Sequence, residues 1–78
     1  MQLDFFVLGS VIRGIRQKKG LSQEVVSGLA GIARTHLTMI ENGTKQPNLE
    51  TICRIAQAFD MRASELIRRV EEEQLKEQ

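Results

Sequence analysis

The 78-residue chain has one cysteine, one histidine and one proline, and neither tryptophan nor tyrosine. A single cysteine cannot form an internal disulfide bond, and one cysteine with one histidine does not make a metal site. No apolar run approaches the roughly 20 residues of a membrane-spanning helix, and Leu3 to Leu8 is too short for a signal peptide. We therefore expect a cytoplasmic protein without metal or cofactor, in which Cys53 is a buried or half-buried, unreactive thiol.

Net positive charge is also small, but it is concentrated in one part of the chain. The overall charge is +1, which by itself argues against a nucleic-acid partner. Residues 13–45 nevertheless carry six basic side chains against two acidic ones, whereas residues 46–78 carry five basic and seven acidic ones. Because the distribution of charge matters more than its sum, residues 13–45 are the segment favoured for contact with a polyanion.

Apolar residues recur at helical spacing in five segments, and none alternates as a strand would. The helices are expected at about 4–19, from Ser22 to the glycine at 31, at 33–41, after Asn48, and at about 62–75. We predict an all-α, five-helix bundle that forms one domain over 1–78. The residues expected to face its core are Leu8, Val11, Ile12, Ile15, Val26, Ala30, Ile32, Leu37, Ile40, Leu49, Ile52, Ile55, Ala56 and Phe59.

The segment Ser22 to Gly43, SQEVVSGLAGIARTHLTMIENG, contains two of these helices with Gly31 between them. A sharp turn needs a residue that adopts positive φ without a Cβ penalty, which glycine supplies. Polar side chains lie off the inward face of the second helix, where bases and phosphates are plausible targets. This arrangement is typical of a helix-turn-helix.

Four linked phrases strengthen that interpretation and resemble the Cro and phage-repressor type of helix-turn-helix protein, also called the xenobiotic-response-element family. The similarity runs from about Val11 to Leu66, and within the family the chain is most similar to controller proteins of restriction-modification systems. The resemblance implies a lambda-repressor-like bundle that binds DNA. The phrases are IRxxRxxKGLSQE (12–24), AGIARTHL (30–37), IENGTKQP (40–47) and NLETICRIAQAFD (48–60).

The second helix of the motif would be the recognition helix, whose first turn enters the major groove deepest. Arg34 is the leading base reader because a guanidinium can bond O6 and N7 of guanine together; a phosphate contact is the alternative. His36 stands where the family often has Tyr, and either contacts DNA or is an exposed bystander. Met39 either touches a thymine methyl or packs internally. The candidates for base contact are Arg34, Thr35, His36, Thr38 and Met39.

Phosphate contacts are expected on either side of the recognition helix. The start of the preceding helix offers free amides and a positive dipole end, which suit a phosphate. The resemblance implies that Gln23 lies against DNA and orients the recognition helix, and that the following loop is a second phosphate clamp. A solvated helix start and an ordinary polar turn are the alternatives. The candidates are Ser22, Gln23, Asn42, Thr44, Lys45 and Gln46.

Glu41 invites a catalytic interpretation, which we reject because no nucleophile, metal or second acid accompanies it. The resemblance implies instead that Glu41 pairs with Arg16 and ties the recognition helix to the first helix. Two residues depart from the family pattern: Ala33 stands where a Ser or Thr usually caps the recognition helix, and Ser27 replaces a small apolar residue. We expect a loosely capped recognition helix, and a Ser27 hydroxyl bonded back to its own helix.

A domain of this size reads about half a site, so tight binding requires two copies on half-sites about 34 Å apart. Apolar residues at both ends exceed what a five-helix core needs, and we expect the C-terminal helix and the N-terminal aromatics to form a dimer interface. The alternative is that an aromatic covers its own core and the tail frays. The interface candidates are Phe5, Phe6, Leu66, Ile67 and Val70, with Leu3 and Leu75 beside them.

These observations predict a dimeric transcription regulator, not an enzyme, that binds an inverted-repeat operator in double-stranded DNA. A restriction-modification controller is the leading form. The alternatives are an antitoxin or phage-type repressor and, more remotely, a protein–protein adaptor. A regulator of this kind would also contact RNA polymerase, and an antitoxin would contact its toxin.

Overall fold

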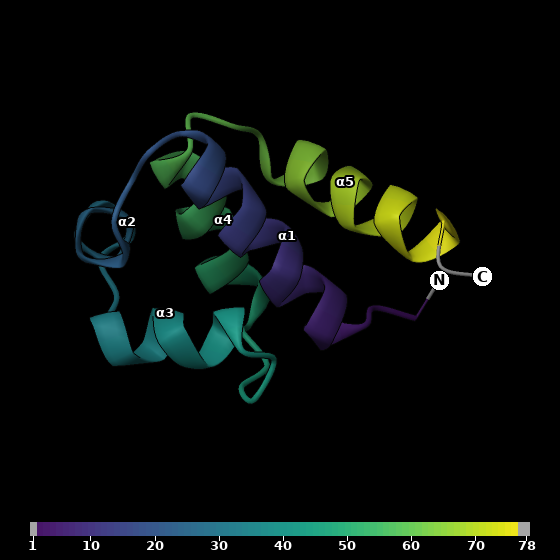
Figure 1. Cartoon of the computed structure of the whole chain (residues 1–78), viewed down its shortest axis with the longest axis horizontal. Helices are drawn as coiled ribbons and strands as arrows, with labels where there is room; N and C mark the ends of the chain where they lie inside the picture. Colours follow the sequence, from purple (N-terminus) through teal and green to yellow (C-terminus); the bar gives the residue numbers. More distant parts are fainter. Residues whose placement is uncertain (1, 77–78) are drawn as a thin grey trace.

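In the computed structural model, residues 2–76 are described and form five helices without a strand. The helix α1 runs through the middle of the molecule, with α3 along one side of it and α5 along the other, while α2 lies against α4 (Figure 1). The prediction of an all-α bundle is confirmed. Residue 1 and residues 77–78 of the predicted domain lie outside the described residues. The helices are α1 (Phe5–Lys18), α2 (Gln23–Ala30), α3 (Arg34–Glu41), α4 (Leu49–Ala58) and α5 (Ala63–Lys76).

Side-chain caps explain why three of these helices begin where they do. The carboxylate of Asp4 accepts from the amides of the first turn of α1, Ser22 Oγ accepts from the Val25 amide, and Asn48 accepts from the Thr51 amide. Each such cap contributes about 1 kcal/mol. Ala33 gives α3 no side-chain cap, as predicted, so the first amides of α3 are left without a side-chain acceptor.

Glycines with positive φ end the two helices of the motif. Gly31 has φ 70° between α2 and α3, where it turns the chain as the sequence predicted. Gly43 has φ 76° after α3, and its amide donates to the Ile40 carbonyl while the Thr44 amide donates to the Met39 carbonyl. This pair of bonds satisfies the carbonyls at the end of α3 and aims the following loop.

The hydrophobic core draws residues from all five helices, with Leu8, Ile12, Leu37, Ile55 and Phe59 almost wholly buried. Two predictions about α4 are wrong. Leu49 is 70% exposed because it occupies the first position of α4, a turn ahead of the first core residue. Cys53 is exposed as well, since it lies off the Ile52–Ile55–Ala56 stripe that faces inward.

The predicted dimer interface also needs correction in α5. Leu66 and Val70 are fully buried in the protomer's own core, because α5 packs its apolar stripe against α1 and α4. Both residues are therefore unavailable to a second copy. Leu3, Phe5 and Ile67 are partly buried against the same core, whereas Phe6 is 71% and Leu75 is 63% exposed.

A side-chain amide joins the two ends of the fold. Gln74 of α5 accepts from the Asp4 amide at 2.9 Å and donates to the Gln2 carbonyl at 2.9 Å. The segment that leads into α1 is thereby fixed beside the end of α5 (Figure 1). None of the helices within residues 2–76 combines the length and apolar character that crossing a bilayer requires.

Candidate nucleic-acid interface

The outward face of α3 carries the side chains that were predicted to read bases. Leu37 and Ile40 are buried, which leaves Arg34, Thr35 and Met39 exposed on the opposite side of this short helix. The flanking candidates for phosphate contact are exposed, except for the half-buried Gln23. These exposed residues are Ser22, Asn42, Thr44, Lys45 and Gln46.

An ion pair between α1 and the end of α3 holds the recognition helix in place. Arg16 Nε lies 2.8 Å and Nη2 3.0 Å from the two oxygens of Glu41, so the pair is bidentate. The side chains are 12% and 2% exposed, and Arg16 Nη1 also donates to the Leu21 carbonyl. The hydrogen bond to Glu41 raises the pKa of Arg16 above its ordinary value. The ion pair implied by the resemblance is thus present, and Glu41 has a structural role, because it joins the end of α3 to α1.

Two further side chains extend this pair into a network across three helices. Gln23 Nε2 donates to Glu41 Oε1 at 3.0 Å, and Thr38 Oγ1 lies 3.1 Å from Gln23 Oε1 and 3.0 Å from the Arg34 carbonyl. The first residue of α2, Gln23, is therefore held by the second turn and by the last residue of α3. Sequence reasoning placed Gln23 as an orienting residue but missed its contact with Thr38.

A polar hollow lies where the start of α2 meets α1 and the first turn of α3. Its walls carry three arginines and one carboxylate together with the exposed Ser22 hydroxyl. Ser22 Oγ accepts from the Val25 amide, which leaves the hydroxyl proton free to donate. The excess of positive charge suits an anion such as a phosphate. The lining residues are Arg13, Arg16, Ser22, Gln23, Glu24 and Arg34.

Other polar side chains near this face make contacts within the protein. Thr44 donates its hydroxyl proton to the Met39 carbonyl at 3.1 Å, so in the free protein its side chain satisfies a carbonyl in the last turn of α3. Ser27 Oγ donates to the Glu24 carbonyl at 3.1 Å, as predicted. His36 is partly buried, and its Nε2 has no hydrogen-bond partner among the described residues. His36 is therefore not the fully exposed bystander of the alternative interpretation.

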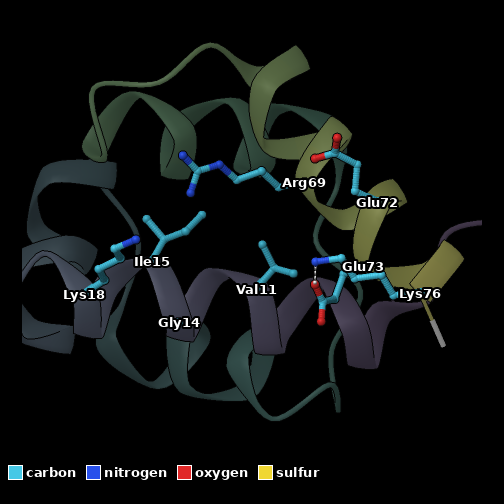
Figure 2. A pocket seen from close by; sticks show the side chains of 8 residues that line it. All are labelled: Val11, Gly14, Ile15, Lys18, Arg69, Glu72, Glu73 and Lys76. Carbon is cyan, nitrogen blue, oxygen red and sulfur yellow. Dashed lines mark ion pairs between the residues drawn. The ribbon is translucent and has the colours of Figure 1, made fainter.

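A second groove, between α1 and α5, has a different character. Figure 2 shows Val11, Gly14 and Ile15 on α1 facing Arg69 and other charged side chains on α5. The rim is mixed in sign, because Lys18, Arg69 and Lys76 stand beside Glu72 and Glu73. A polyanion would meet two carboxylates here, so this groove is a weaker candidate for a nucleic-acid interface than the α2–α3 face.

The turn at Gly31, the buried side of α3 and its exposed polar side define a helix-turn-helix protein. The model of the Helix-turn-helix family matches residues 12–66. The chain therefore belongs to the Helix-turn-helix family, and the resemblance drawn from the sequence is confirmed.

Individual relatives give the same result. The HTH-type transcriptional regulator y4dJ of Sinorhizobium fredii is 33% identical over 61 residues, 78% of this chain and 79% of y4dJ. The ImmF control region 10 kDa protein of Bacillus phage phi105 is 41% identical over 54 residues, 69% of this chain and 60% of that protein. The restriction-modification controller protein C.AhdI from Aeromonas hydrophila has a TM-score of 0.78 at 34% identity, covering 83% of this chain and 98% of C.AhdI.

Proposed function

We propose that the protein is a sequence-specific, DNA-binding transcription regulator of the restriction-modification controller type, acting as a dimer and without enzymatic activity. The observation that carries the proposal is the exposed polar face of α3, held on its scaffold by the Arg16–Glu41 pair. The likeness to C.AhdI, at 34% identity over nearly all of that chain, supports the controller type.

The proposal assigns distinct roles to the residues of this face. Arg34 and Thr35 would enter the major groove and read base edges, with Met39 one turn further along. Phosphates would be bound on one side by Ser22, Gln23 and the hollow at the start of α2, where free amides and the helix dipole add to the arginines. On the other side they would be bound by the exposed Asn42, Lys45 and Gln46.

Selection of bound duplexes from a random DNA pool tests this function directly. We expect an inverted motif whose half-sites are centred about one helical turn apart, with an affinity that falls as the salt concentration rises. If no sequence is enriched at low salt and high protein concentration, the regulator proposal fails and a protein partner takes its place.

Replacing Arg34 with Ala should weaken binding to the selected operator by about 1–3 kcal/mol and relax the preference at one base pair of each half-site. Fluorescence anisotropy on the operator and on its single-base variants measures both effects. Lys45→Ala is the matched control, because loss of a phosphate contact weakens binding to all sequences alike. Equal loss on every sequence for Arg34→Ala would assign Arg34 to a phosphate.

The dimer, in this proposal, uses apolar residues that the protomer leaves accessible, above all Phe6, together with the partly buried Phe5 and Ile67. Sedimentation at tens of micromolar should give a dimer, and Phe6→Ser should shift it toward monomer. Leu29→Ser is the control, because Leu29 is 65% exposed on α2, at the opposite side of the molecule from the start of α1 (Figure 1). Equal effects of the two substitutions would contradict this interface.

A further inference from the structure

The hydrogen-bond network around Glu41 has a fixed direction. A buried carboxylate only accepts hydrogen bonds, so the Gln23 atom that faces Glu41 must be the amide nitrogen. The amide oxygen then faces Thr38, whose hydroxyl donates to it. Arg16 donates to Glu41 from one side, and Thr38 and Gln23 form a chain of donors toward it from the other. Bonds aligned in this way strengthen one another.

We propose that Thr38 is a positioning residue that holds Gln23 ready for a DNA phosphate, and that it does not read a base. The inference rests on the DNA-binding function proposed above. It identifies Thr38 as the residue that orients Gln23, one of the proposed phosphate contacts. With Gln23 Oε1 bonded to Thr38 and one Nε2 proton bonded to Glu41, the second Nε2 proton is the donor left for a ligand. Gln23 lines the polar hollow, where a phosphate would accept that proton.

The position of Thr38 supports this assignment over base contact. Thr38 lies in the second turn of α3 and is half-buried, unlike the exposed Arg34 and Thr35 of the first turn. Its single hydroxyl proton is shared between Gln23 Oε1 and the Arg34 carbonyl, at 3.1 and 3.0 Å. Donating this proton to a base would break both contacts, whereas a positioning residue keeps them when DNA binds.

A double-mutant cycle separates the two roles. Thr38→Val keeps the shape of the side chain and removes the hydroxyl, and it should weaken operator binding by about 2- to 13-fold, the range for one neutral hydrogen bond. Thr38→Ser should restore binding. In a Gln23→Ala background, the same Thr38→Val change should have less than about a 2-fold effect, because its target is gone. An undiminished loss in that background, or no loss in the native one, would overturn the proposal.

A measurement without DNA tests the contact by itself. In nuclear magnetic resonance spectra, Thr38→Val should shift the Gln23 side-chain amide signals, while the backbone amides of Ile55 on α4 and Val70 on α5 stay in place. Unmoved Gln23 signals would overturn the proposal whatever the binding data show. If the native protein selects no operator, the role toward phosphate fails together with the proposed function, and the spectra then report only whether Thr38 holds Gln23.

Discussion

Replacing Glu41 with Ala should lower the free energy of unfolding by about 3–5 kcal/mol, enough to leave a domain of this size barely folded. The loss comes from Arg16, whose side chain is 12% exposed and would be left without its buried carboxylate partner. Gln23 would lose its acceptor at the same time. Urea denaturation followed by circular dichroism measures the change, as a lower midpoint.

Two comparisons isolate this cause. Glu50→Ala removes a solvent-exposed ion pair, the i,i+4 contact to Arg54 at 3.4 Å. This change should alter the free energy of unfolding by about 0.5 kcal/mol or less. Replacing Arg16 with Met and Glu41 with Leu together should cost less than Glu41→Ala alone, since no buried charge is left unpaired. An unfolding midpoint for Glu41→Ala equal to that of Glu50→Ala would contradict the structural role of the pair.

The parts of the fold that the sequence predicts well are those with local signals. The caps Ser22 and Asn48 and the turn at Gly31 each depend on residues within a few positions, so they can be identified without knowing the tertiary structure. The pairing of Arg16 with Glu41 spans 25 positions. No local signal predicts that pair, and only the resemblance to a family implied it.

The errors have a common physical origin. Helical periodicity shows which face of α5 is apolar but not which element covers it, so Leu66 and Val70 were assigned to a second copy although α1 and α4 cover them. Leu49 was assigned to the core for the same reason, because it continues the apolar stripe of α4 one turn beyond the part that the core buries. The contact between Thr38 and Gln23 was missed for a related reason, because the distance between these side chains depends on how closely α2 and α3 pack.

Gly9 is another position whose importance appears only in three dimensions. It is buried in α1, where a Cβ would lie 2.3 Å from the Ile40 carbonyl oxygen and 2.7 Å from that of Glu41. Both neighbours are backbone atoms at the end of α3, so no side chain can move aside to admit the methyl group. The glycine therefore sets how closely α1 approaches the recognition helix.

Gly9→Ala should accordingly destabilise the protein by about 3 kcal/mol, because the two helices must separate and the core between them must repack. Thermal unfolding measures the loss, and operator binding should weaken with it, since α3 carries the proposed contacts. Gly14→Ala is the matched control in the same helix. It lies at the open α1–α5 groove (Figure 2), with nothing within 4 Å of its Cβ position.

At Gly14 only helix propensity changes, and alanine should stabilise the protein by about 0.5–1 kcal/mol. The two substitutions add the same methyl group to the same helix, so opposite signs would isolate the close approach at Gly9 as the cause. If both stabilise the protein alike, α1 does not contact the end of α3 this closely, and the Arg16–Glu41 pair must then position the recognition helix without that support.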